Sequence, residues 1–181
     1  MLDFSAKKVY GPVPEGKYEL SIETAEFGQS ETGKNFISLN FVVREDVDQP
    51  NQGSHIWDSI WENQIFVNQT TGREISKDKY EKLPPNQKGN YSGEMRYADY
   101  KIRPLIQAQD ADPEIVDENG NRKPNPEYKT SFVDMDEVVL FLNGLNIKAT
   151  VGITTDNTGK ERNTIDYRSI SRTDYSDGLP F

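Results

Sequence analysis

Trp57 and Trp61 lie four residues apart in segment 54–68, whose alternating side chains predict a β-strand. Neighbouring side chains of a strand point to opposite faces, so both indoles share one face while Ile56 and Ile60 share the other. The isoleucine face suits a core, and the indoles are therefore expected to point outward. Exposed aromatic rings on a sheet can stack unpaired bases, at about 1–3 kcal/mol per base and with little sequence preference. The alternative is that a helical insertion covers the tryptophans.

Phe36 extends this aromatic face onto the preceding predicted strand, and Lys34, in the connection before it, could contact a phosphate. A second candidate segment is 89–103, where tyrosines alternate with cations, a mixture suited to phosphates and stacked bases. Its candidate residues are Tyr91, Arg96, Tyr97, Tyr100, Lys101 and Arg103. The alternatives for this segment are a surface helix anchored by tyrosines and an ordinary solvated face.

Residues for catalysis or metal binding form no recognisable group in the sequence. The single histidine, His55, lies in a predicted strand, and the chain has no cysteine with which to complete a metal site. The acidic segment 117–120 fails the calcium-loop pattern, because its glycine comes too early and no glutamate stands at the twelfth position. No phosphate-binding loop, nucleophile elbow or metalloprotease motif is present. We therefore predict a protein that is not an enzyme and that uses no metal or cofactor.

The net charge argues against nucleic-acid binding, but the charge is unevenly distributed along the sequence. The formal net charge is −9, whereas phosphate contact needs a positive surface. Residues 73–103 nevertheless hold eight basic and five acidic side chains, and residues 110–137 hold three basic and nine acidic ones. The lack of cysteine suits a reducing cytoplasm, and no apolar run has the length of a signal peptide or a membrane span. We expect a cytoplasmic protein that has no contact with a membrane.

Only 34% of the 181 residues are hydrophobic and the mean hydropathy is −0.81, so we expect one small core with long loops. Five strands are predicted, three before a helix-bearing insertion and two after it. Their ranges are 16–27, 35–45, 54–68, 146–154 and 163–171. The insertion is predicted to begin with a helix at 76–83, capped by Ser76. An ambiguous segment follows, with a helix near 94–102 that Pro104 interrupts. An extended or mobile acidic loop at about 109–130 and a helix at 134–144 complete the insertion.

This order predicts a mainly β fold, a five-stranded OB-fold-like barrel with a helix-containing insertion between its third and fourth strands. Such barrels commonly bind single-stranded nucleic acid on the face of the second and third strands. The alternative is a generic antiparallel sandwich. Residues 1–172 would form this domain, and residues 173–181 a flexible C-terminal interaction tail.

The last residues of the chain, Asp177-Gly178-Leu179-Pro180-Phe181, resemble the C-terminal tip of bacterial single-stranded DNA-binding proteins. In that family the tip docks onto replication and repair partners, with the phenylalanine in an apolar pocket. The resemblance implies partner binding by Asp177, Leu179, Pro180 and Phe181. The tail has fewer acids than that family, since Gly178 stands where another acid is usual.

The body of the chain resembles a different family, the single-stranded DNA-binding proteins encoded by phages of Gram-positive bacteria. Three segments carry the resemblance: Gly16–Ile22 in the first strand, the turn Ser30–Phe36, and Phe141–Leu145 leading into the strand that follows it. The resemblance implies single-stranded DNA binding in phage replication, recombination or repair, in the cytoplasm of a bacterial host. It also implies replication or recombination proteins as partners and allows a homo-oligomer.

A β-barrel adaptor that binds protein and not DNA is the alternative from another functional class, and the charge of −9 favours it. A nuclease or other hydrolase is a more distant third.

Overall fold

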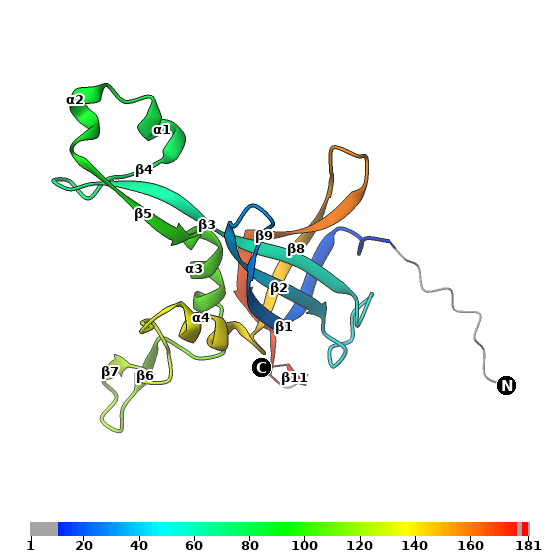
Figure 1. The fold of residues 1–181 in the computed structure, drawn as a ribbon. Helices are drawn as coiled ribbons and strands as arrows, with labels where there is room; N and C mark the ends of the chain where they lie inside the picture. The colour runs from blue at the N-terminus through cyan, green and yellow to red at the C-terminus, as the bar shows by residue number, and fades with distance from the viewer. Residues whose placement is uncertain (1–10, 177–178, 181) are drawn as a thin grey trace.

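The sheet is built around β1 (Gly16–Gln29), a long strand that pairs with two different neighbours along its length. Its first part pairs with β8 (Asn146–Thr155), and its second part pairs with β2 (Asn35–Val43). A register shift between Ile22 and Thr24 bends β1 where the partners change. The computed structural model describes residues 11–176 and 179–180, and the sheet curls strongly into an antiparallel half-barrel (Figure 1).

The remaining long strands are β3 (His55–Asn68), which pairs with β2, and β9 (Glu161–Arg172), which pairs with β8. The five strands predicted from sequence are therefore all present, with ends within about two residues of the expected ones. The mainly β character and the curled antiparallel sheet are confirmed. The described part of the chain has no ladder between β3 and β9, so the half-barrel is open along this gap.

The core fills the concave side of the half-barrel. Inward side chains alternate along the strands, as expected, and helices cover the open end. The side chains that are almost fully buried include Leu20, Ile22, Ile37, Leu39, Phe41, Ile56, Ile60, Leu105, Leu142, Ile147 and Val151. Asn40 lies opposite Trp57 on the outer face of the sheet, yet its neighbours cover it. Its amide donates to Glu23 Oε2 at 2.7 Å, and its oxygen lies 3.1 Å from His55 Nδ1.

Four helices occupy the insertion between β3 and β8. They are α1 (Lys77–Glu81), α2 (Pro85–Lys88), α3 (Asp99–Gln107) and α4 (Met135–Leu142). Ser76 caps α1 as predicted, because its hydroxyl accepts from the Lys79 amide. Asp134 caps α4 in the same way, through the Glu137 amide at 3.0 Å, and Gly144 follows that helix with a φ of 81°.

The segment after α2 differs from the expectation of a helix near 94–102. Residues Tyr91–Tyr97 form a strand, β5, which pairs with the distal half of β3. The helix comes later, as α3, and Pro104 lies inside it where an interruption was predicted. Proline removes the hydrogen bond to the carbonyl of Tyr100, and that residue lies on the exposed first turn, where water can replace the bond.

Five short strands complete the described part of the structure. β4 (Glu74–Ser76) pairs with β3 next to α1. β6 (Glu114–Val116) and β7 (Arg122–Pro124) form a hairpin in the acidic segment that was predicted as an extended or mobile loop. The side-chain amide of Gln109 joins the two ends of that segment, because it bonds both the N–H and the C=O of Lys129. β10 (Tyr175–Ser176) and β11 (Leu179–Pro180) pair near the C-terminus.

Candidate nucleic-acid interface

The two tryptophans of β3 lie on the outer face of the sheet, as their spacing predicts. Trp57 is 63% exposed and Trp61 is 37% exposed, whereas Ile56 and Ile60 are buried beneath them. The helices of the insertion therefore leave both indoles open to solvent.

Phe36 joins Trp61 across the β2–β3 ladder, in which the two residues are direct partners. Their ring centroids lie 4.8 Å apart at an interplanar angle of 50°. The ammonium of Lys34 lies 5.1 Å from the Trp61 ring and 3.0 Å from Asn63 Oδ1. We call Phe36, Trp57 and Trp61 the aromatic platform, and Lys34 is the cation at its edge.

Gly28 supports the aromatic platform, a role that the sequence alone did not indicate. It pairs with Phe36 across the β1–β2 ladder, and a Cβ added there would lie 2.5 Å from the Phe36 Cζ. The Phe36 ring therefore rests against the bare backbone of Gly28. A glycine in an otherwise regular strand signals such a close approach, but the approaching group depends on the register.

The Trp57 end of the platform opens into a groove. His55 lies beside Trp57 with its ring at an interplanar angle of 15°, and the centroids are 6.5 Å apart. The groove has a volume of about 1410 Å³ and lies between the β2–β3 connection and the β8–β9 connection, with Lys160 among its lining residues. A flexible chain laid along Trp61 and Trp57 would continue into this space.

The tyrosines of segment 89–103 are not part of the platform. Tyr91 packs edge-on against Tyr80, at 6.2 Å between centroids, and Tyr97 packs against Phe27 at the same distance. Burial, with the charges of Glu62 and Asp136, raises the pKa of Tyr97 above its usual value. Tyr100, at 70% exposed, is the one of the three that is free to stack on a ligand.

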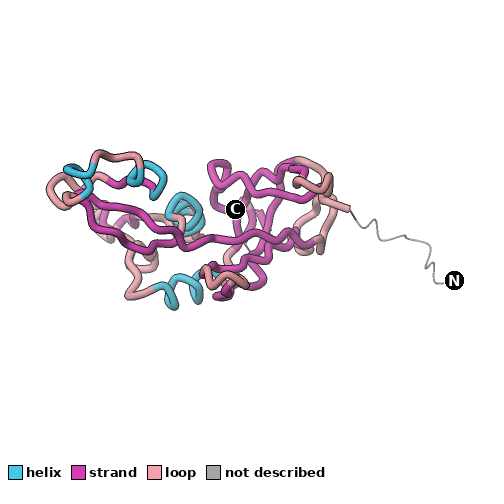
Figure 2. Tube along the Cα trace, turned by 45° about the horizontal axis from the view of Figure 1, so that its top comes forward, coloured by secondary structure: helices cyan, strands magenta, loops and turns pink. Residues whose placement is uncertain are grey.

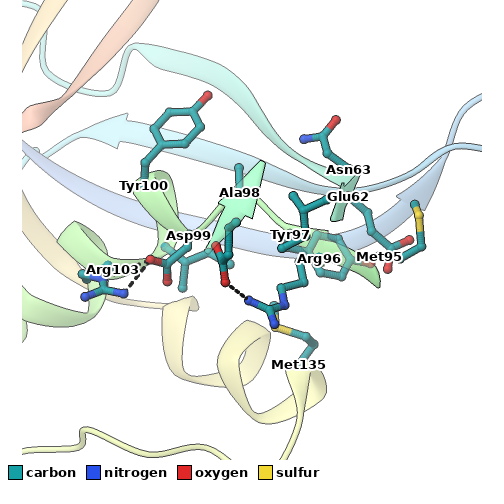
Figure 3. A pocket seen from close by; sticks show the side chains of 13 residues that line it. Glu62, Asn63, Met95, Arg96, Tyr97, Ala98, Asp99, Tyr100, Arg103 and Met135 are labelled. Carbon is teal, nitrogen blue, oxygen red and sulfur yellow. Dashed lines mark hydrogen bonds and ion pairs between the residues drawn. The ribbon is translucent and has the colours of Figure 1, made fainter. Parts of the chain in front are cut away.

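The cations of the same segment each have carboxylate partners. Arg96 contacts Glu94 and Glu74 at 2.6 Å, which raises the pKa of its guanidinium, and Arg103 contacts Asp99 at 2.7 Å. These residues line a separate pocket of about 700 Å³ at the base of β5, where Tyr100 points away from Met135 (Figure 3). Their charges are already neutralised, so they are weaker phosphate candidates than the sequence suggested.

Lys101 has a structural position that the sequence did not reveal. Its ammonium contacts both carboxylate oxygens of Asp58, at 3.0 and 2.9 Å, and the carbonyl oxygen of Ser59 at 2.9 Å. It also lies 4.9 Å from the ring of Tyr167 on β9. Lys101 thus spans the gap between β3 and β9, and its side chain is only 16% exposed.

Residues 11–176 and 179–180 hold no group of three histidine or acidic side chains arranged to bind a metal ion. No helix within the same residues has the length and apolar character needed to cross a bilayer.

The predicted partner-binding tip lies largely outside the described residues. Asp177 and Phe181 are not described, and of Leu179 and Pro180 the structure describes the backbone, which pairs with Tyr175 and Ser176. The residues just before the tip are held to the body. Thr173, buried, donates to Glu19 Oε2 at 2.5 Å and accepts from the Arg44 guanidinium at 2.8 Å.

Residues 2–83 match a family described as a protein of unknown function, DUF669. The match spans less than half of the chain and includes β1, β2, β3 and α1, so it contains the whole aromatic platform. No curated protein matches the chain.

Proposed function

We propose that the outer face of β2 and β3 binds single-stranded DNA without strong sequence preference. The observation that carries this proposal is the pair of exposed indoles, Trp57 and Trp61, with Phe36 and Lys34 packed beside Trp61. Ring faces bind any base, and a neighbouring ammonium binds phosphate, so the set suits an unpaired strand.

The fold supports this proposal. We propose that β1, β2, β3, β8 and β9 form an OB-type barrel, with α3 in the interruption between β3 and β9. In such barrels the second and third strands provide the nucleic-acid face, and here these strands carry the aromatic platform. An antiparallel sandwich fits less well, because a single sheet curls around one core.

The charge of the molecule sets how this binding should respond to salt. The chain carries −9 overall, and Lys34 is the cation that directly contacts the platform. We therefore expect stacking to supply a large part of the affinity, with a log–log salt slope of about 0.7 for each phosphate neutralised.

The test is titration with oligo-dT at two salt concentrations. The chain has two tryptophans, both in the platform, so quenching of intrinsic fluorescence reports on that surface. We expect quenching by oligo-dT, and much weaker quenching by a duplex of the same length. Lack of any binding to oligo-dT at low salt would reject the proposal.

A double variant, Trp57→Ala with Trp61→Ala, locates the site. It has no tryptophan, so its binding is measured by the anisotropy of a labelled oligonucleotide. We expect a loss of roughly 2–6 kcal/mol for two stacking positions, which would abolish measurable binding. Leu140→Ala removes an apolar side chain of 74% exposure on α4 and serves as the matched control.

A second candidate is an adaptor whose barrel binds a protein. The ion pairs that neutralise Arg96, Lys101 and Arg103 favour it, because they remove cations that a DNA-binding surface would use. If the barrel is an adaptor, the double tryptophan variant should bind its protein partner more weakly, and neither it nor the wild type should bind oligonucleotides.

We also propose that residues 177–181 recruit replication or recombination proteins. The support is the resemblance of Leu179-Pro180-Phe181 and the preceding aspartate to a known docking tip. Deletion of these five residues should leave oligo-dT binding unchanged while it weakens partner capture. Loss of DNA binding in the deletion variant would count against this assignment.

A further inference from the structure

A long arm projects from the half-barrel, and the proposed function leaves it without a role. The arm consists of residues 62–97: the distal half of β3, the short strand β4, helices α1 and α2, and β5. Figures 1 and 2 show β3 running without a break from the half-barrel into the arm, with β5 beside it. The face of β3 that carries Trp57 and Trp61 continues into the arm at Asn63 and Ile65, whereas α1 packs on the opposite face, against Phe66, so a DNA strand must pass the edge of β3 to reach α1.

A notch joins the platform to the arm. On one edge of β3 the pairing with β2 ends at Trp61, and the pairing with β4 begins at Ile65. A pocket of about 620 Å³ lies there, between Lys34 at the edge of the platform and Lys77 at the start of α1. This volume lies within the range of pockets that hold small organic groups, so a nucleotide leaving Trp61 could pass through the notch.

The arm differs in charge from the rest of the molecule. The arm, residues 62–97, holds six basic and five acidic side chains, a balance of +1, while the rest of the chain carries −10. Within the arm, residues 73–88 hold five basic and three acidic side chains. Arg73, Lys79 and Lys82 are exposed, and within the described part of the chain none of the three forms an ion pair. These cations are therefore available to an anionic ligand.

The arm holds these cations on a rigid support. The rings of Phe66 on β3 and Tyr80 on α1 stack at 3.7 Å with an interplanar angle of 2°. Tyr91 packs against Tyr80 from β5, and Lys88 covers it with its ammonium 5.5 Å from the ring centroid. A hairpin alone is marginally stable, but this aromatic cluster fixes α1 to the strands. The backbone that carries Lys79 and Lys82 is therefore held in place, so less of the chain has to be ordered when a ligand binds.

We propose that the arm is a second contact surface for the same single strand, one that binds its phosphate backbone through Arg73, Lys79 and Lys82. The inference rests on the proposed function, because the strand reaches the arm from the platform by way of the notch. From Trp57 to Val67, β3 rises about 33 Å, so the complete site is much longer than the platform. Base stacking acts at one end of this site and charge at the other.

The experiment compares two lengths of oligo-dT on the full chain. One has about 6 nucleotides, near the lower limit for a single OB-type site, and the other has about 25. The variant is Arg73→Gln, Lys79→Gln and Lys82→Gln together. The control changes three exposed cations outside the arm by the same charge: Lys17→Gln, Lys123→Gln and Arg168→Gln.

We expect the arm variant to bind the long oligonucleotide at least tenfold more weakly than the control variant does. Its salt slope should fall by about 2, because three phosphate contacts are lost. Both variants should bind the short oligonucleotide as the wild type does, and both should melt at the wild-type temperature.

Three results would overturn the inference. The first is that the arm variant binds the long oligonucleotide as tightly as the control variant does, and the second is that it loses equal affinity for both lengths. The third is a change in sedimentation of the free arm variant, which would make the arm an interface between copies of the chain. If the wild type bound neither length, the proposed function itself would fail, which is distinct from these results.

Discussion

Gly28 decides where the Phe36 ring can lie, although it has no side chain of its own. We predict that Gly28→Ala pushes the ring away from Gly28 and disrupts its contact with Trp61, because the new Cβ would lie 2.5 Å from Cζ. The cost in stability should be small, because the ring is the free end of a surface side chain. The cost in oligo-dT affinity should be about 0.5–1.5 kcal/mol, a fraction of one stacking contact.

Gly89→Ala is the matched control for this prediction. Gly89 has helical backbone angles and open space around its Cα, so a methyl group there should change neither stability nor binding. Equal affinities for the two alanine variants would show that the position of Phe36 does not matter for binding.

Tyr167 makes stability depend on pH in the alkaline range. Burial of its ring, together with the charge of Asp58, raises the pKa of the hydroxyl above its usual value of 10. The unfolded chain then releases this proton near pH 10 while the folded chain keeps it. The contribution is constant below pH 10, and stability falls above it by up to about 1.4 kcal/mol per pH unit.

Tyr167→Phe should remove this part of the alkaline decline. The hydroxyl has no hydrogen-bond partner of good geometry among the described residues, so its loss should cost little at pH 7. Urea unfolding of both proteins at pH 8 and pH 11 measures the difference. A wild type and variant that decline in parallel would contradict the prediction.

At the scale of elements, α3 takes the place of strand pairing between β3 and β9. The Ala98 amide, just before the helix, donates to the Trp61 carbonyl, and Lys101 caps the Ser59 carbonyl on the same edge of β3. The helix also buries Leu105 in the core. Two carbonyl groups on the open edge of β3 are thus hydrogen-bonded, one by the backbone just before α3 and one by an ammonium group.

We predict that Lys101→Met lowers the free energy of unfolding by about 1–3 kcal/mol, because the partly buried carboxylate of Asp58 loses its cationic partner. Its effect on the salt slope of oligo-dT binding should be negligible. Arg103→Met, on the same helix with 67% side-chain exposure, is the control and should change stability by less than about 0.5 kcal/mol. The opposite pattern, with intact stability and weaker binding, would return Lys101 to its predicted role as a phosphate contact.

Local pattern explains which elements could be predicted. The five long strands alternate cleanly, and Ser76 and Asp134 are strong helix caps, so these elements follow from short-range chemistry. Residues 91–97 alternate as well, with Tyr91, Met95 and Tyr97 on one face and Ser92, Glu94 and Arg96 on the other. Their partner does not follow from this pattern, because they pair with the distal half of β3, which is a long-range effect.

The same distinction holds for the candidate site. The outward direction of Trp57 and Trp61 follows from strand period alone. The contact of Phe36 with Gly28 needs the register of β1 and β2, and the pairing of Lys101 with Asp58 needs the packing of α3 against the sheet. A basic residue can be found in the sequence, but its carboxylate partner depends on tertiary structure.

At the scale of the whole molecule, the two residues after Arg172 contact the body of the protein. The tail was expected to begin at residue 173, yet Thr173 is buried and bonds both Glu19 and Arg44. The amide of Asp174 also donates to Glu19 Oε1 at 3.0 Å, and its carboxylate forms an ion pair with Lys148. Residues after Arg172 therefore help to neutralise charged groups beneath the half-barrel.

Two truncations test this boundary. Removal of residues 177–181 leaves the contacts of Thr173 and Asp174 intact, and we expect the free energy of unfolding to change by less than about 0.5 kcal/mol. Removal of residues 173–181 deprives the buried carboxylate of Glu19 of two donors, and it deprives Arg44 of two acceptors, the Thr173 hydroxyl and the Tyr175 carbonyl. The free energy of unfolding of this shorter chain should fall by about 1–3 kcal/mol, because Glu19 and Arg44 would stay buried without their hydrogen-bond partners. Urea unfolding measures both, and equal stabilities would place the boundary at Arg172, where the sequence put it.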